Sequence, residues 1–205
     1  MKTKLSILSL CVLILSSCGT SDAIKYNKRG LDYLKQGKYE LAIADFNTAI
    51  KIDPKCTDAY GFRAITYNEQ GKYDSAIANF NYAIKIDPKL VKAYNNRGYT
   101  YCVLNKYELA IADFNSALKI DPLFAEALYN RGYTFHEQGK YELSIADFNS
   151  AIKINPQYAD AFYYRGVVYY KLGKKDLSIS DLKKAADLGN LDAKKILKEK
   201  FNIDY

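Results

Sequence analysis

The stretch that decides the fold runs from residue 107 to residue 122 and reads YELAIADFNSALKIDP. Residues 39–54, 73–88 and 141–156 repeat it almost letter for letter. Each copy ends in a proline, and the four prolines of the chain stand 34 residues apart: Pro54, Pro88, Pro122 and Pro156. A fixed period of this length, with apolar residues at helical spacing inside it, predicts an array of repeated helical hairpins.

Small and large side chains recur in register with the period. In the first copy the small residues are Gly30, Ala42 and Ala49, and the large ones are Tyr33 and Phe46. Small residues let two antiparallel helices approach each other, and large residues fill the space between neighbouring hairpins. These recurring repeat positions therefore predict both the pairing of the helices and the composition of the core.

The ends of the predicted helices are marked as well. In the third hairpin Asn105 follows the first helix. In the other four hairpins a glycine stands at this position: Gly37, Gly71, Gly139 and Gly173. Glycine and asparagine tolerate the left-handed conformation that ends a helix. The residue before each proline is pushed out of the helical region, which ends the second helix.

These residues resemble the tetratricopeptide repeat family, and the resemblance covers about 170 residues. It implies an all-α fold, a right-handed α-α superhelix of five helix-turn-helix repeats, at 23–56, 57–90, 91–124, 125–158 and 159–190. The last repeat is degenerate, because Asn190 stands where proline would be. Residues 191–205 are predicted to form a capping helix and tail, since a repeat array needs a polar end. A helix lying on a membrane surface is the alternative for this segment.

The first residues predict export. Lys2 and Lys4 precede an apolar run over residues 5–15, which is too short to span a membrane and fits a secretory signal. The following Leu-Ser-Ser-Cys, ending at Cys18, resembles the lipobox of bacterial lipoproteins. That resemblance implies cleavage of residues 1–17, acylation of Cys18, a short tether over residues 18–22 and anchoring in the bacterial cell envelope, at the outer membrane facing the periplasm. The alternative is an ordinary signal peptide.

A row of arginines and a row of acidic residues accompany the repeat. Arginine recurs on the first helix at Arg29, Arg63, Arg97, Arg131 and Arg165. Sixteen residues later, on the second helix, stand Asp45, Asn79, Asp113, Asp147 and Asp181. We expect internal Arg–Asp pairing, because an unpaired buried arginine is costly. The alternative is an anion-binding row.

The resemblance implies a concave groove lined by the first helices. Carried over to this chain, it selects a set rich in tyrosine and asparagine: Asn27, Asn68, Asn95, Asn96, Tyr99, Tyr129, Asn130, Tyr133, His136, Tyr163, Tyr164 and Tyr170. Asparagine can donate to and accept from a peptide backbone, and tyrosine supplies contact area at low entropic cost. We expect this set to bind a peptide or helix of a partner protein, and about half of its members to serve packing instead.

Signals for chemistry are absent from the sequence. His136 is the single histidine, no glycine-rich phosphate loop is present, and the acidic residues follow the repeat period. We therefore expect no enzyme, no catalytic residues, no metal and no cofactor. The charge of +7 is spread along the chain without a basic stripe, so no nucleic-acid partner is expected. Cys56 and Cys102 are predicted to be free, packed thiols, because the helical offset between them is too long for a disulfide.

The sequence thus favours an envelope lipoprotein that serves as a scaffold or adaptor for another envelope protein or peptide. Its membrane contact would be the lipid on Cys18. A second hypothesis is a homodimer that self-associates through its convex face or edge. An envelope hydrolase is the third, and it would need a catalytic cluster that breaks the 34-residue period.

Overall fold

The computed structural model describes residues 18–205, which form eleven α-helices and no β-strand. The helices are α1 (Ser21–Lys35), α2 (Tyr39–Ile52), α3 (Thr57–Glu69), α4 (Tyr73–Ile86), α5 (Val91–Val103), α6 (Tyr107–Ile120), α7 (Ala125–Glu137), α8 (Tyr141–Ile154), α9 (Ala159–Lys171), α10 (Lys175–Asp187) and α11 (Leu191–Phe201). The all-α prediction is confirmed for this part of the chain. The predicted signal peptide, residues 1–17, lies outside the described residues.

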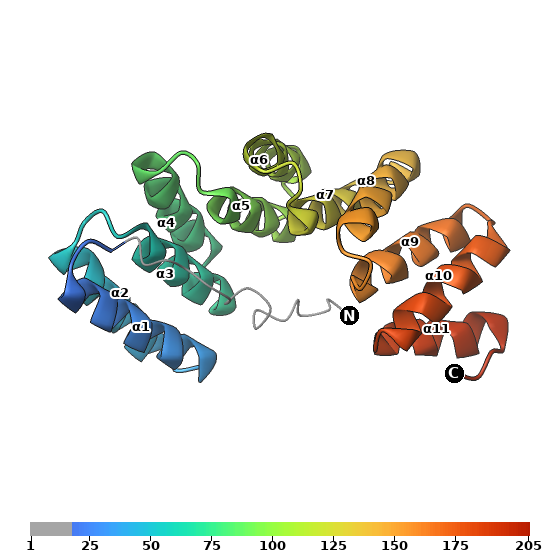
Figure 1. The fold of residues 1–205 in the computed structure, drawn as a ribbon, viewed down its shortest axis with the longest axis horizontal. Coiled ribbons are helices and arrows are strands. Elements are labelled where there is room, and N and C mark those ends of the chain that lie inside the picture. Colours follow the sequence, from blue (N-terminus) through green and yellow to red (C-terminus); the bar gives the residue numbers. More distant parts are fainter. Residues whose placement is uncertain (1–17) are drawn as a thin grey trace. The chain divides into compact units, whose positions relative to one another are not determined.

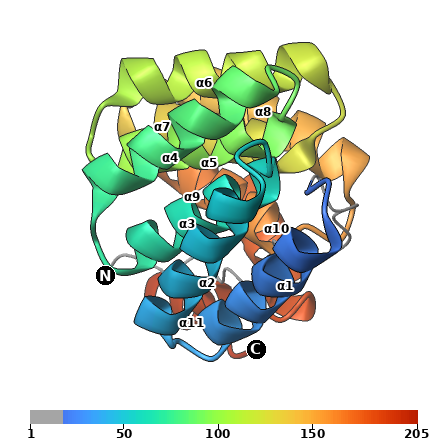
Figure 2. The same ribbon diagram turned by 90° about the vertical axis from the view of Figure 1, so that its left-hand side faces the viewer.

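The described residues fall into two compact units, divided between Thr100 and Tyr101. In the first unit α1 lies antiparallel beside α2, and α3 beside α4 (Figure 1). The view in Figure 2 shows the same α1–α2 pair side by side. In the second unit α7 pairs with α8 and α9 with α10, and α11 packs on α10.

Proline and the residue before it end the second helices. At Asp53, Asp87, Asp121 and Asn155 the backbone turns extended, with φ between −125° and −131°. Each of these side chains also accepts a hydrogen bond from the N–H two residues further on, as Asp53 Oδ1 does from Lys55 at 3.0 Å. The acidic or amide residue therefore stabilises the turn that proline enforces.

The first helices end as predicted. Gly37, Gly71, Gly139 and Gly173 have φ of 71° to 73°, and Asn105 has φ of 57°. This left-handed conformation costs little for glycine and is tolerated by asparagine. The break lets the second helix of each hairpin start two residues later.

The core of each hairpin is a large residue held against a glycine or alanine. Four phenylalanines and a leucine at the same repeat position are completely buried: Phe46, Phe80, Phe114, Phe148 and Leu182. In the first hairpin a Cβ added to Gly30 would lie 2.7 Å from Cε1 of Phe46. Gly30 thus allows a close approach of Phe46 that a side chain at this position in the first hairpin would obstruct.

Gly30→Ala should therefore lower stability, although alanine favours a helix. We expect a loss of about 1–3 kcal/mol from overpacking against Phe46. Gly61 provides the matched control, because it lies inside α3 with nothing within 4 Å of its added Cβ. Gly61→Ala should raise stability by about 0.5–1 kcal/mol. Urea midpoints of the two variants should move in opposite directions, and a shared direction would contradict the packing argument.

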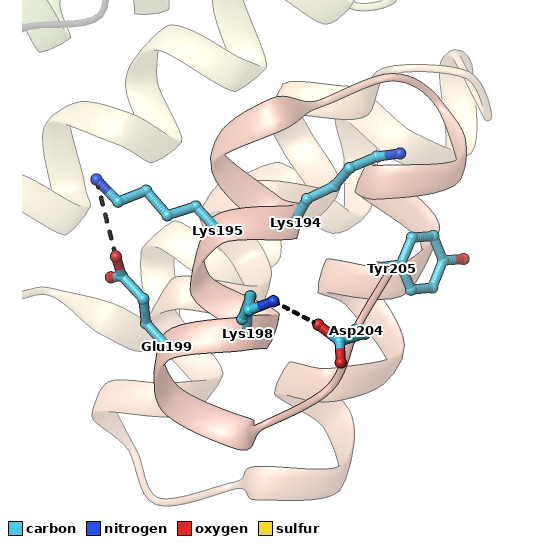
Figure 3. A pocket seen from close by; sticks show the side chains of 6 residues that line it. All are labelled: Lys194, Lys195, Lys198, Glu199, Asp204 and Tyr205. Carbon is cyan, nitrogen blue, oxygen red and sulfur yellow. Dashed lines mark hydrogen bonds and ion pairs between the residues drawn. The ribbon is translucent and has the colours of Figure 1, made fainter.

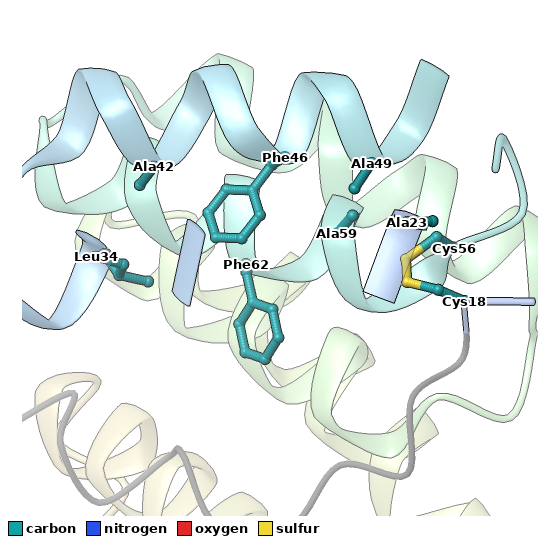
Figure 4. Packing of buried hydrophobic residues seen from close by; sticks show 9 residues of the cluster. All are labelled: Cys18, Ala23, Leu34, Ala42, Phe46, Ala49, Cys56, Ala59 and Phe62. Atoms are coloured by element: carbon teal, nitrogen blue, oxygen red, sulfur yellow. A yellow bond between two sulfur atoms is a disulfide. The ribbon is translucent and has the colours of Figure 1, made fainter. Parts of the chain in front are cut away.

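The amino-terminal segment is packed against the first two hairpins. Cys18 and Cys56 form a disulfide with a Cα–Cα distance of 4.2 Å, inside a cluster with Ala23, Ala49 and Ala59 (Figure 4). The prediction that Cys56 is free is wrong, because the chain before α1 folds back to the start of α3. Cys102 is a free cysteine, as predicted.

The predicted tether at residues 18–22 is likewise held to the body of the protein. The N–H of Gly19 donates to Asp53 Oδ2 at 2.6 Å, and Thr20 caps α1 by accepting from the N–H of Ala23. Ser21 and Asp22 already belong to α1. The sequence, read as a linear string, could not show this docking.

The carboxy-terminal helix α11 covers the last hairpin. Leu197 and Ala193 are completely buried against Leu182 and Ala185 of α10. Asn190 caps α11, with its Oδ1 accepting from the N–H of Ala193 at 2.8 Å. In the other repeats the proline follows the end of the second helix. In the fifth repeat asparagine stands at that position and caps the start of the next helix.

Candidate functional site

The predicted Arg–Asp pairing is present in both units. Arg131 on α7 donates through Nε to Asp147 Oδ2 at 2.8 Å and through Nη2 to Oδ1 at 2.7 Å. The same two bonds join Arg29 to Asp45 and Arg165 to Asp181. Bidentate pairs of this kind are among the stronger side-chain interactions. The prediction of internal pairing is confirmed for these three repeats.

The second repeat shows what the carboxylate contributes. There Asn79 replaces the aspartate, and its Oδ1 accepts from Arg63 Nε at 2.7 Å while its Nδ2 donates to the Ser75 carbonyl. Burial lowers the pKa of Arg63, because no carboxylate offsets it. Burial also acts on Arg165, but the hydrogen bonds and charge of Asp181 outweigh it and raise the pKa. The aspartate therefore stabilises the cation inside the fold.

Each arginine after the first repeat also reaches the preceding repeat, a contact that the sequence did not predict. The Nη1 of four arginines donates to an asparagine on the second helix of the previous hairpin: Arg63 to Asn47, Arg97 to Asn81, Arg131 to Asn115 and Arg165 to Asn149. Arg131 and Arg165 thus have Nε, Nη1 and Nη2 engaged within the protein. Their arrangement supports repeat–repeat joints rather than an anion-binding row.

An aromatic ring lies against most of these guanidinium groups. The rings of Tyr26, Tyr60 and Tyr94 lie 5.1–5.6 Å from the guanidinium carbon of the arginine three residues later, and Phe162 lies 5.5 Å from that of Arg165. Such cation–π contacts add to the pairing. The recurrence of these rings every 34 residues was the sequence signal from which the cation–π contacts could have been predicted.

The residues predicted to line a groove differ in exposure. Four of them are buried: Asn27, Asn95, Tyr129 and Asn130. Seven are partly buried: Asn68, Asn96, Tyr99, Tyr133, His136, Tyr163 and Tyr164. Tyr170 is 45% exposed. The partly buried and exposed members therefore contribute to the protein surface, and the buried ones contribute to the core.

In the first unit the predicted residues do not form one cluster. Asn68 on α3 donates through Nδ2 to Thr100 Oγ1 on α5 at 2.8 Å, and Thr100 in turn donates to the Asn96 carbonyl. Asn68 is therefore engaged in joining two repeats. Among residues 18–205, the buried Oδ1 of Asn27 and that of Asn68 have no hydrogen-bond partner.

In the second unit the predicted residues converge on a continuous set of rings, which we call the tyrosine cluster: Tyr129, Tyr133 and His136 of α7, Tyr163 and Tyr164 of α9, and Tyr158 before α9. Tyr164 lies edge-on to Tyr133 at 5.0 Å and to Tyr163 at 4.9 Å between ring centroids. Tyr129 lies 4.9 Å from Tyr158, a residue that the sequence reading did not select. Sequence alone placed the other five on the first helices, and the fold brings them into contact.

Burial changes the chemistry of these side chains. It raises the pKa of Tyr163 to about 12, and it raises the pKa of Tyr133 further, aided by Glu137. The phenols are therefore neutral hydroxyl groups at physiological pH. They can donate and accept hydrogen bonds while their rings offer apolar contact.

His136 is the polar member of the cluster that the fold leaves unsatisfied. Its Nδ1 lies 3.2 Å from Glu137 Oε1, and its buried Nε2 has no hydrogen-bond partner among residues 18–205. Burial lowers the pKa of His136, although the neighbouring Glu137 opposes the shift. Nε2 is thus a buried polar atom whose hydrogen-bonding capacity is unused among the described residues.

The lowered pKa of His136 predicts how stability depends on pH. The unfolded chain binds a proton near pH 6.5, whereas the folded protein resists it, so stability falls as pH drops from about 7.5 through 6.5 toward the folded pKa. His136→Gln should reduce this acid-side loss. Thermal melts of both proteins between pH 7.5 and 5 test the expectation. An identical pH slope would show that His136 does not titrate differently on folding.

A surface pocket lies elsewhere, on α11 and the tail (Figure 3). Its charges are paired with one another: Lys198 with Asp204 at 2.7 Å and Lys195 with Glu199 at 3.9 Å. Lys194 lies over the ring of Tyr205. These contacts hold the tail against the capping helix, and the pocket has no ring or histidine of the tyrosine cluster.

Among residues 18–205, no group of three or more histidine, cysteine, aspartate or glutamate side chains could hold a metal ion. Within the same residues, every helix is too short or too polar to cross a membrane.

Comparison with known families settles the class of fold. Profiles of the tetratricopeptide repeat match residues 27–90, 79–112, 98–139, 132–173 and 160–188. The chain belongs to the tetratricopeptide repeat (TPR) family. The matched segments together run from residue 27 to residue 188.

Solved TPR structures resemble this chain in fold. PilF of Pseudomonas aeruginosa is 21% identical with a TM-score of 0.80, covering 88% of this chain and 85% of its own. PilW, described as a widely conserved type IV pilus biogenesis factor, is 23% identical with a TM-score of 0.77, covering 91% and 96%. YrrB, described as a TPR protein with an unusual peptide-binding site, is 24% identical with a TM-score of 0.63, covering 85% and 92%. The comparison with curated proteins gives no match.

Proposed function

We propose that this TPR protein is an adaptor of the bacterial cell envelope that binds a peptide or helix of a partner protein on its first helices. The observation that carries the proposal is the tyrosine cluster, which joins α7 and α9 through ring centroids 5.0–6.2 Å apart. Partly exposed phenols beside an unsatisfied histidine nitrogen offer both apolar area and hydrogen bonds to a polypeptide. No catalytic role is assigned to any of these side chains.

Two of the solved neighbours support the choice of partner class. The peptide-binding site of YrrB and the pilus-biogenesis role of PilW belong to those proteins, and each is a property that a TPR adaptor of the envelope would share. The partner itself is defined here by chemistry: an extended or helical segment with apolar side chains and free backbone or side-chain polar groups.

A photoreactive probe tests the binding surface. p-Benzoylphenylalanine at Tyr133 or Tyr163 should crosslink a defined envelope protein in living cells. Tyr82 on α4 provides the matched control, because it is also a tyrosine on a helix and is 56% exposed outside the cluster. The same product from Tyr82, or none from either cluster site, would reject the proposed surface.

The proposal includes a lipid anchor on Cys18, as the lipobox-like residues before it imply. The lipid would be attached to the Cys18 sulfur through a thioether bond, and the same sulfur cannot also form a disulfide. An acylated protein therefore cannot contain the Cys18–Cys56 bond. Acylation would leave Cys56 and Cys102 as thiols, and several acyl chains would hold the protein firmly at the membrane.

Intact mass and thiol counting decide between these fates. The full chain is expressed in a bacterial host, and the mature product is expected to begin at Cys18, to carry the lipid mass and to present two thiols after unfolding. Cys18→Ser should release it from the membrane fraction. A product without lipid that presents one thiol after unfolding would reject the anchor and leave the disulfide as the state of Cys18.

A further inference from the structure

The outer surface of the second helices carries a row of exposed leucines. Leu109 on α6, Leu143 on α8 and Leu177 on α10 are each 49–50% exposed. The next residue along each helix is completely buried, so the inward packing of the helix turns the leucine outward. Leu41 on α2 is similar, but Ser75 interrupts the row on α4. Three consecutive repeats of the second unit thus present apolar side chains to solvent.

On α8 the leucine belongs to a smooth apolar ridge. Leu143, Ala146, Ser150 and Ile154 follow one another at helical spacing on one face of the helix. The first three are exposed, and Ile154 is partly buried against the core beneath. Ser150 donates its hydroxyl to the Ala146 carbonyl at 3.0 Å, so the polar atom is already satisfied. Small residues in the middle of such a ridge allow another helix to approach closely.

The charges beside the ridge are arranged so that the surface complements itself. Glu142 at the start of α8 and Lys153 at its end are both exposed and lie on the same flank, about 17 Å apart along the helix. An antiparallel copy, related by a two-fold axis level with Phe148, places Glu142 opposite Lys153 of the second copy. The same rotation places Leu143 opposite Ile154, and Ala146 opposite Ser150, of the second copy.

α8 differs in one respect from the other helices that carry this pattern. Gln70 donates to Glu40 at the start of α2, and Gln138 donates to Glu108 at the start of α6. Leu172 stands at the corresponding position of the fifth repeat and has no donor to offer Glu142. The glutamate of α8 therefore lacks the glutamine contact that its counterparts make.

We propose that the outer ridge of α8 is the contact surface for a second copy of this chain, paired antiparallel about a two-fold axis. Leu109 lies on the second helix of the preceding repeat, and Leu177 lies on the second helix of the following repeat. The ridge lies on α8, whereas the tyrosine cluster lies on α7 and α9 and in the loop between α8 and α9. Self-association and partner binding are thus separate properties, and either can fail without the other.

Charge reversal tests both the surface and its register. The full chain is purified in detergent, and its mass is measured by light scattering over a range of concentrations. The wild type should dimerise, Leu143→Glu should remain monomeric, and Glu142→Lys or Lys153→Glu alone should each weaken the dimer about tenfold through two like-charge contacts. An equimolar mixture of the two reversed variants should associate again, because each mixed pair brings opposite charges together.

Leu41→Glu on α2 is the matched control, since it places the same change in the same sequence context outside the row. It should leave the dimer intact, and circular dichroism should show all variants folded. A wild type that stays monomeric, a mixture that does not recover, or an effect of Leu41→Glu equal to that of Leu143→Glu would each overturn the proposal.

Discussion

Asp147→Ala should destabilise the second unit by about 3–5 kcal/mol, because it leaves the guanidinium of Arg131 buried without its counter-charge. The Asp147 side chain is 8% exposed and that of Arg131 is 23% exposed, so water replaces the lost carboxylate poorly. Arg131 also links its hairpin to Asn115 of the preceding repeat. The change should therefore weaken the joint between repeats as well as the hairpin. Urea titration followed by circular dichroism measures the loss.

The second repeat provides the control for this prediction. Asn79 occupies the same position and still accepts from Arg63. Asp147→Asn should consequently cost less than Asp147→Ala, because one acceptor for Arg131 remains, although the charge and the second hydrogen bond are lost. Equal losses for the two variants would show that the acceptor does not matter. An unchanged urea midpoint for Asp147→Ala would reject the pairing as a source of stability.

Phe148→Ala should be about as damaging, with an expected loss of about 3–5 kcal/mol from the lost apolar contacts and the cavity left behind. Phe148 is completely buried, and its ring lies 6.0 Å from that of Tyr129 and 6.4 Å from that of Tyr164. Removing it should also loosen the tyrosine cluster. The pKa of Tyr133, which packs against the same core cluster as Phe148 and is raised by burial, should move down. Ultraviolet titration of the tyrosines reports that shift.

Leu182 shows how to separate size from chemistry at this position. It stands in the fifth repeat where Phe148 stands in the fourth, and it is also completely buried. Phe148→Leu should therefore cost less than about 1.5 kcal/mol, since most of the volume is kept. A loss as large as that of Phe148→Ala would mean that the aromatic contacts, and not the filled space, stabilise this hairpin.

Much of the fold could be predicted because its signals are local and repeated. Proline and its preceding residue act on the backbone beside them, as at Asp53 and Pro54, and left-handed residues such as Asn105 act on their own φ. The Arg–Asp pairs were also accessible, since two residues 16 apart on one hairpin meet whenever that hairpin forms. The recurrence of each signal every 34 residues removed the ambiguity that a single copy would have left.

The candidate site was predicted less completely. The repeat register placed Tyr133, His136 and Tyr164 on first helices, but not which of them would be covered. Tyr129 is buried and Tyr163 partly exposed because different neighbouring rings pack over them, including that of Tyr158 from the preceding loop. Exposure depends on side chains from other repeats, and the sequence does not state their orientation.

The sequence by itself determined the all-α class, the helix ends and the hairpin pairing, because backbone preferences and residues 16 apart decide them. The tertiary structure alone decided the contacts between hairpins. It joined Arg131 to Asn115, brought Cys18 beside Cys56 across 38 residues, and left the outer ridge of α8 exposed. Such contacts arise when one hairpin packs on the next, and they depend on the direction and distance of that packing rather than on any local pattern of residues.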